Sequence, residues 1–146
     1  MWRRVPGYGP DCTPWAIVGE APGPEEALTG RPFVGPAGQF LRARLRETPG
    51  APAAEKLYWT NAVLEPYLPG QAPPRSVVQA NRMRLRQELV ERQVQYVLAA
   101  GGTAAQALGL SGTVTDLRGR WAWAEGFWVL PTFHPSACLR SERWTT

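Results

Sequence analysis

Short apolar runs alternate along the chain with segments of helical periodicity. The apolar runs predict buried strands over residues 15–18, 57–63, 96–100 and 127–130. Apolar side chains at helical spacing predict helices over residues 36–47, 76–92 and 103–108. Because strands and helices alternate, we predict a three-layer α/β/α fold around a central four-stranded, mostly parallel sheet.

Glycine and proline mark the segments between these elements. Residues 1–14 are rich in both and predict an irregular N-terminal arm, while residues 66–74 contain four prolines and predict a loop. Apolar positions on either side of Glu125 and Gly126 predict a hairpin that ends in the last strand of the sheet. The length of 146 residues suits one domain, so we expect residues 1–146 to form a single unit.

Composition excludes several classes of protein. A hydrophobic fraction of 44% argues against intrinsic disorder, and no apolar run approaches the roughly 20 residues of a membrane helix. Two cysteines, Cys12 and Cys138, are too few for a four-cysteine metal cage or a disulfide framework. With no secretory leader visible, we expect an intracellular, cytoplasmic protein that has no membrane partner. The net charge of +4 is carried by 15 arginines and one lysine, and arginine suits phosphate contacts.

Distinctive polar residues follow the predicted strands. Ligands of parallel sheets bind beyond the carboxyl ends of the strands. Glu20 lies in a glycine-rich turn after the first strand, Asn61 ends the second, and His134 follows the last. An asparagine amide both donates and accepts, as reading the edge of a pyrimidine requires. Phe33 is either an aromatic platform for a base or a core residue.

Four motifs in order resemble those of the uracil-DNA glycosylase superfamily, in particular its family-4 branch of bacteria and archaea. The first is Val18-Gly19-Glu20-Ala21-Pro22-Gly23 followed by Gly30-Arg31-Pro32-Phe33-Val34-Gly35-Pro36-Ala37-Gly38. The others are Asn61-Ala62-Val63, the strand-turn-helix at residues 98–105, and the closing segment at residues 130–140. The resemblance implies a monofunctional glycosylase that removes uracil from DNA by flipping the base and hydrolysing the N-glycosidic bond.

The resemblance also implies roles for individual residues. Phe33 stacks on uracil, Asn61 reads its O4 and N3 edge, and His134 hydrogen-bonds O2 and stabilises the departing anion. Glu26 crowds C5 and so rejects thymine. The resemblance further implies substrate contacts from the turn after the first strand and DNA contacts from the closing segment: Gly19, Ala21, Pro22 and Gly23 for the substrate, and Ser136 and Arg140 for DNA.

Two points stay open at this stage. Glu20 is the nearest carboxylate for activating the attacking water, but it has the alternative role of orienting its loop. The phosphate contacts have several candidates besides Arg140, for which a solvated surface position is the alternative reading: Arg3, Arg4, Arg82, Arg86 and Arg143.

The chain departs from the family-4 pattern in its cysteines. Family members typically hold a [4Fe-4S] cluster with four cysteines, of which this chain keeps at most Cys12; the stretch after Asn61 and the helix around Asn81 have none. We therefore expect no iron–sulfur centre, no metal and no other cofactor. The closing motif is followed by few residues, which indicates a compact prokaryotic or viral variant or a fragment.

The departures leave alternative functions open. One is a catalytically silent DNA- or protein-binding member of the superfamily. Another is a glycosylase for other deaminated bases, which the intact Asn61 disfavours. Under the main interpretation we expect a monomer that binds uracil-containing DNA and releases free uracil.

Overall fold

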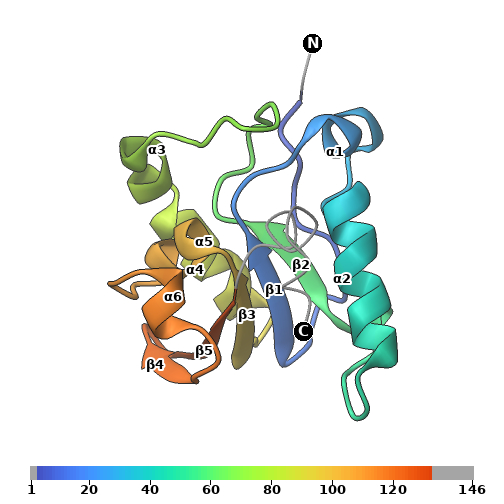
Figure 1. Ribbon diagram of the computed structural model, residues 1–146, viewed down its shortest axis with the longest axis vertical. Coiled ribbons are helices and arrows are strands. Elements are labelled where there is room, and N and C mark those ends of the chain that lie inside the picture. The colour runs from blue at the N-terminus through green and yellow to red at the C-terminus, as the bar shows by residue number, and fades with distance from the viewer. Residues whose placement is uncertain (1–2, 133–146) are drawn as a thin grey trace.

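A five-stranded sheet forms the centre of the molecule in the computed structural model, which describes residues 3–132 (Figure 1). Its order is β2-β1-β3-β5-β4. The strands are β1 (Trp15–Gly19), β2 (Tyr58–Asn61), β3 (Tyr96–Ala100), β4 (Ala122–Ala124) and β5 (Phe127–Thr132). The first four in this order run parallel, and β4 pairs antiparallel with β5. The mostly parallel sheet is confirmed, and its strand beyond the four predicted is the short first arm of the hairpin.

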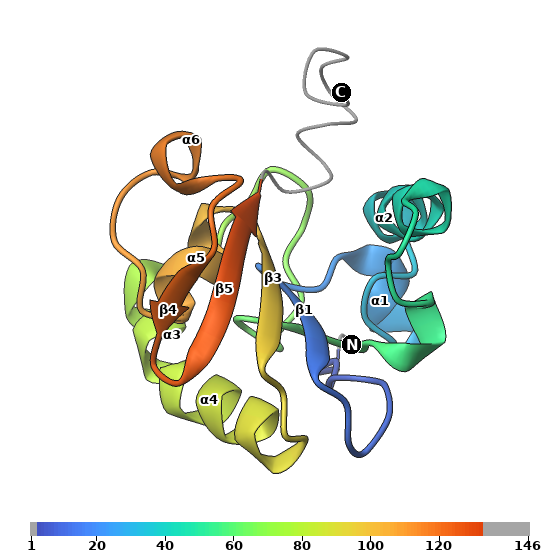
Figure 2. The ribbon, with the colours of Figure 1, turned by 90° about the horizontal axis from the view of Figure 1, so that it is seen from below.

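Helices cover both faces of the sheet (Figure 2). On one face lie α1 (Pro24–Thr29) and α2 (Pro36–Glu47), with the 3₁₀ turn η1 (Ala54–Lys56) before β2. On the other face lie α3 (Arg75–Ala80), α4 (Arg82–Glu91) and α5 (Gly102–Ala107), while α6 (Val114–Leu117) packs beside β5. The predicted three layers are thus present. No helix of residues 3–132 is both long and apolar enough to cross a membrane.

The alternation of side chains along each strand divides the core in two. On β1, Val18 joins the cluster under α4 and α5, where it is buried with Leu85 and Leu89. The neighbouring Ile17 points to the other face and packs with Trp59 in the cluster beneath α2. Each fully buried aliphatic side chain contributes about 1.5–3 kcal/mol, so both faces of the sheet stabilise it.

The helix predicted over residues 76–92 is wrong as a single element, because it is interrupted at Asn81. The Asn81 side-chain amide donates to the Val77 carbonyl at 2.8 Å. Its backbone carbonyl accepts from the amide of Leu85, which starts the hydrogen bonds of α4. An asparagine that bonds nearby backbone groups competes with a continuous helical ladder, and this explains the division into α3 and α4.

Residues 3–14, the described part of the N-terminal arm, lie outside the helices and strands and are packed against the sheet. Val5 is buried, and its amide donates to the Leu64 carbonyl at 2.9 Å. Tyr8 exchanges two backbone hydrogen bonds of 2.8 Å with Trp59 of β2. The arm therefore covers the free edge of β2.

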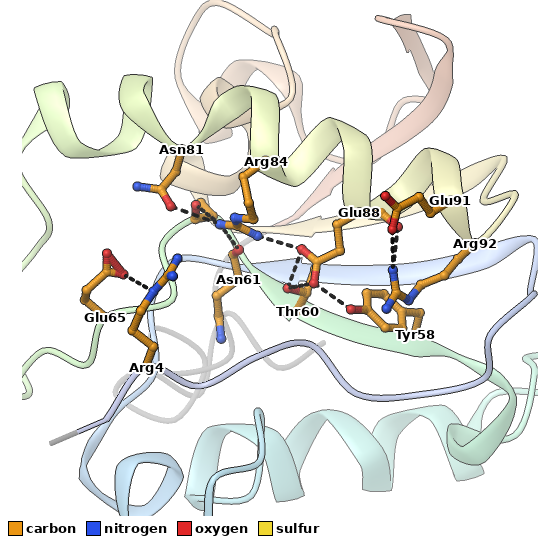
Figure 3. Close-up of polar contacts among 11 residues, drawn as sticks. Arg4, Tyr58, Thr60, Asn61, Glu65, Asn81, Arg84, Glu88, Glu91 and Arg92 are labelled. Carbon is orange, nitrogen blue, oxygen red and sulfur yellow. Dashed lines mark hydrogen bonds and ion pairs between the residues drawn. The ribbon is translucent and has the colours of Figure 1, made fainter.

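A polar network joins β2 to α4 (Figure 3). One Glu88 oxygen accepts from the Tyr58 hydroxyl at 2.5 Å, and both oxygens lie 3.1 Å from the Thr60 hydroxyl. Arg84 donates to Glu88 at 2.6 Å and to the carbonyls of Asn61 and Ala62. Burial, and then the hydrogen bond to Glu88, raises the pKa of the Tyr58 phenol. The network thus holds the end of β2 that carries Asn61.

Replacing Glu88 with alanine tests this network. The variant leaves the Tyr58 and Thr60 hydroxyls without their acceptor and Arg84 without its carboxylate. We expect the free energy of unfolding in a urea titration to fall by about 2 kcal/mol, less than for a fully buried ion pair because Arg84 and Glu88 are only partly buried. Glu91→Ala, an exposed carboxylate on the same helix, is the control and should change it by less than about 1 kcal/mol. Equal effects of the two variants would contradict this account.

Candidate active site

A cavity of about 480 Å³ opens where β1, β2 and β3 end. Five segments of the described chain line it: residues 20–26, Phe33 with residues 35–38, Asn61, residues 67–72 and residues 100–103. The sequence placed a ligand site at the carboxyl edge of the sheet, and this cavity lies at that edge. Its volume is in the range of sites that hold a small molecule such as a nucleobase.

Phe33 and Asn61 meet over Gly19. A Cβ atom on Gly19 would lie 2.6 Å from both the Asn61 Oδ1 and the Phe33 Cζ, so the two side chains occupy the space above this glycine. Asn61 is 3% exposed, its backbone carbonyl accepts from Arg84, and its side chain points away from α4 (Figure 3). The aromatic ring and the amide expected to contact a base therefore line one cavity.

The loop that carries Phe33 has an unusual backbone. Phe33 has φ of 57°, in the left-handed region that costs a side-chain-bearing residue about 1–2 kcal/mol. Its carbonyl accepts from Arg42 Nε at 3.3 Å, and a Cβ on Gly38 would overlap that same carbonyl. The ring also packs on Trp59 with centroids 5.3 Å apart. Phe33 is thus both a core residue and part of the cavity wall, which joins the two readings left open by the sequence.

Glu26 is a buried carboxylate that binds backbone amides. It is 8% exposed; one oxygen accepts from the Gly23 amide at 2.9 Å. The other oxygen accepts from the Val34 amide at 2.9 Å and the Gly35 amide at 2.6 Å. The amide of Gly23, a residue expected to contact the substrate, is therefore bonded to Glu26, and Glu26 links the turn after β1 to the Phe33 loop.

Glu20 also lines the cavity and bonds to Thr103. The Thr103 hydroxyl donates to the Glu20 carboxylate at 2.6 Å, and the Glu20 carbonyl accepts from the Val63 amide at 3.0 Å. Thr103 belongs to the strand-turn-helix motif at residues 98–105, but nothing in the sequence indicated a role for its side chain. The pairing of β1 with β3 is the signal that could have revealed it, because it brings the turns after both strands together.

The proline-rich loop forms another wall that sequence analysis did not anticipate. Residues 67–72 line the cavity. The Tyr67 amide donates to the Pro22 carbonyl at 2.9 Å, and the Tyr67 side chain packs against the main core. Reciprocal contacts between Leu68 and Gln71 close a turn at the rim. Pro22 is fully buried and Ala21 packs on the main core, so this turn and the loop are mutually supported.

Two arginines considered for phosphate contacts are engaged elsewhere. Arg82 pairs with Glu125 at 2.6 Å and donates to the Ala107 carbonyl. Arg86 donates to the Glu125 carbonyl at 3.3 Å. These contacts tie α4 to the turn between β4 and β5, and the two residues do not line the cavity.

The remaining predicted site residues, His134, Ser136 and Arg140, lie outside the described residues. β5 ends at Thr132, whose carbonyl accepts from the Gly101 amide at 2.8 Å. Gly101 is part of the cavity wall. The last described residue of the chain therefore lies beside the cavity.

The described residues do not fit an iron–sulfur cluster. Cys12 is the one cysteine among residues 3–132; it is exposed, and its thiol donates to Gln93 at 3.3 Å. The family-4 pattern has a cysteine on the helix around Asn81. Here the Asn81 side chain donates to the Val77 carbonyl and accepts from Arg84. Within the same range, no group of three histidine, cysteine, aspartate or glutamate side chains is arranged to hold a metal ion. A cluster needs its thiolates, and this part of the chain does not supply them.

Comparisons with known proteins agree with the motifs. A type-4 uracil-DNA glycosylase of Thermotoga maritima is 37% identical over 140 residues, covering 94% of this chain and 72% of the relative. One of Pyrobaculum aerophilum is 34% identical over 153 residues, covering 94% of this chain and 74% of the relative. One of Sulfurisphaera tokodaii is 28% identical over 167 residues, covering 95% and 69%.

A family model confirms the same relationship over most of the chain. The model described as the uracil DNA glycosylase superfamily matches residues 6–146. The match includes the turn after β1, Asn61 and the segment that follows β5. The chain belongs to the uracil DNA glycosylase superfamily, and within it the chain is family-4-like.

Proposed function

We propose that this protein is a monofunctional uracil-DNA glycosylase, a hydrolase that removes uracil from DNA at the start of base excision repair. The observation that carries the proposal is the meeting of the Phe33 ring and the Asn61 carboxamide over Gly19 in one cavity. An aromatic face beside an amide that both donates and accepts suits a pyrimidine ring. The names of the relatives, all type-4 uracil-DNA glycosylases, give the same substrate.

In the proposed reaction the uracil nucleotide leaves the stack and its base enters the cavity. Stacking on Phe33 and hydrogen bonds to Asn61 offset the cost of extrusion, which is a few kcal/mol. The bond between C1′ and N1 then breaks, and its electron pair leaves with uracil. His134 donates a hydrogen bond to O2, where negative charge develops. Donors aimed at developing charge stabilise the transition state more than the ground state.

Water completes the hydrolysis by attacking C1′. Its oxygen becomes the new hydroxyl of the abasic sugar, and its proton passes to a base or to solvent. We assign Glu20 to the orientation of this water. The assignment is supported by the hydrogen bond from Thr103, which limits the carboxylate to one direction at the cavity wall. The backbone of Gly19 to Pro22 would contact the base and sugar in the same cavity.

The proposal extends to the partners of the protein. DNA is the substrate, and Ser136 and Arg140 contact the duplex where the base leaves. Free uracil and an abasic site are the products. We further propose that the enzyme acts as a monomer inside the cell and uses no cofactor.

Release of uracil from a labelled deoxyuridine oligonucleotide tests the proposed function. Asn61→Ala and His134→Ala should each lower kcat/KM by about 10²–10³-fold, the loss measured when one donor to a developing anion is removed. The same assay is run on a panel of oligonucleotides that carry uracil, hypoxanthine, xanthine or a thymine mismatch. A folded protein that binds DNA yet makes no abasic site would favour a silent binding module. Excision of a purine with no action on uracil would favour a changed base specificity.

Replacing Gly19 with alanine tests the close approach of the two base-contacting side chains. The added Cβ would lie 2.6 Å from both Asn61 Oδ1 and Phe33 Cζ, so both must move. Since a misplacement of about 1 Å costs about 10²-fold in rate, we expect a loss of that size in kcat/KM for uracil.

Gly50→Ala is the control for this substitution. Gly50 is exposed and lies outside the cavity lining, and its Cβ would meet no atom within 4 Å. Its positive φ of 82° makes alanine cost about 1 kcal/mol of stability, but kcat/KM should stay within a few-fold of wild type. The same loss in both variants, or wild-type activity in Gly19→Ala, would contradict the proposed meeting of Phe33 and Asn61.

The Thr103 hydroxyl provides a test of the role assigned to Glu20. Thr103→Val keeps the shape of the side chain but removes the donor to the carboxylate. We expect kcat to fall by about tenfold, because a general base or water-orienting group contributes about 10²–10⁴-fold and loses part of this when misaligned. Thr103→Ser keeps the hydroxyl and should restore most of kcat in single-turnover assays. Equal rates for Thr103→Val and wild type would remove the support for Glu20.

A further inference from the structure

Glu26 makes contacts that a purely steric role does not require. Crowding at C5 of the base needs only the bulk of its side chain. Yet both carboxylate oxygens point at backbone amides: one at Gly23, the other at Val34 and Gly35, at 2.6–2.9 Å. The Glu26 side chain is 8% exposed, so these three charge-assisted hydrogen bonds are largely shielded from water. They hold the Gly23 turn and the segment at Val34 and Gly35 to one carboxylate, an arrangement that we call the Glu26 anchor.

Two of the amides that Glu26 binds directly follow Phe33, whose ring is proposed to stack on the base. Val34 and Gly35 are the two residues after Phe33, which has φ of 57°. A bulky residue in that region persists only where surrounding contacts hold it. Further contacts on this loop are the bonds from Arg42 to the Phe33 carbonyl and from Gln39 to the Val34 carbonyl. Those two donors hold carbonyl groups, whereas Glu26 holds the amides.

We propose that Glu26 is a positioning residue, whose carboxylate holds the Phe33 loop in the conformation that turns the aromatic ring toward Asn61. This inference rests on the proposed function only for its catalytic consequence. It differs from the steric role in what the side chain must supply: the steric role depends on size, whereas positioning depends on two oxygens that accept three amide hydrogens.

Glu26→Gln separates these roles, because glutamine keeps the size but has only one accepting oxygen. In either orientation its NH₂ group faces at least one backbone N–H that now lacks a partner. We expect kcat/KM for uracil to fall by about tenfold or more, the cost of leaving a buried donor unpaired. Thymine should stay uncleaved. Glu26→Asp keeps the charge but is one methylene shorter, so its carboxylate cannot reach all three amides. Its kcat/KM for uracil should also fall. Glu47→Gln, an exposed residue at the end of α2, is the charge-matched control and should match wild type.

A double-mutant cycle distinguishes positioning from a general loss of stability. If Glu26 acts through Phe33, Glu26→Gln should change kcat/KM by less than about twofold when Phe33 is already alanine. Independent, multiplying effects of the two substitutions would overturn the proposal. It would also be overturned if Glu26→Gln kept wild-type activity while Glu26→Ala gained activity on thymine, because that pattern is expected of crowding alone.

Amide hydrogen exchange gives a readout that needs no activity. The Val34 and Gly35 amides should exchange at least about tenfold faster in Glu26→Gln than in wild type, with the amides of β3 unchanged. Unchanged exchange at these two amides would overturn the proposal even if the protein did not act on uracil. An active wild type with an unaffected Glu26→Gln would overturn this inference and leave the proposed function intact. An inactive wild type with accelerated exchange would overturn the proposed function and leave the anchor intact.

Discussion

The missing side chain at Gly19 is the constraint on which the cavity depends. β1 is a central strand, paired on both sides in parallel, and its last residue lies between the ends of its neighbours. Any Cβ there would overlap both Phe33 and Asn61. Because the backbone of a central strand cannot move without breaking two ladders, the aromatic ring and the amide can meet only if this position is glycine.

Two carboxylates, the buried Glu26 and the partly buried Glu88, hold the residues that meet at this point. Glu88 binds hydroxyl groups of β2 and pairs with Arg84, which in turn holds the carbonyl of Asn61. Glu26 binds amides next to Phe33. Each carboxylate is almost removed from water, and several donors compensate its charge. The two parts of the cavity lining that carry Phe33 and Asn61 are thus positioned by hydrogen bonds to carboxylates on two different helices, α1 and α4.

The hydrogen bonds that hold the cavity lining do not require the cluster cysteines that the chain lacks. In the described residues, β2 and the loop after it are held by the Glu88 network, by the N-terminal arm and by the bond between Tyr67 and Pro22. All of these contacts come from ordinary side chains and backbone groups. Loss of cluster ligands in a family-4-like chain is therefore compatible with an ordered cavity, because Phe33 and Asn61 are fixed by groups that need no metal.

Local pattern was sufficient for the strands, for helix 36–47 and for the sheet type, because these depend on neighbours in sequence and on hydrophobic periodicity. The motifs around Phe33 and Asn61 were identified by their resemblance to a known family. Only the tertiary structure decided which polar groups pair. Thr103 and Glu20 are 83 residues apart, Arg82 and Glu125 are 43 apart, and no local pattern joins them. Glu26 was expected to be a site residue because of the family resemblance, but its hydrogen bonds to Val34 and Gly35 depend on a turn whose positive φ at Phe33 nothing in the sequence indicates. Residue types at strand ends thus determined where the cavity forms, and long-range hydrogen bonds, which periodicity does not encode, decided how its walls are held.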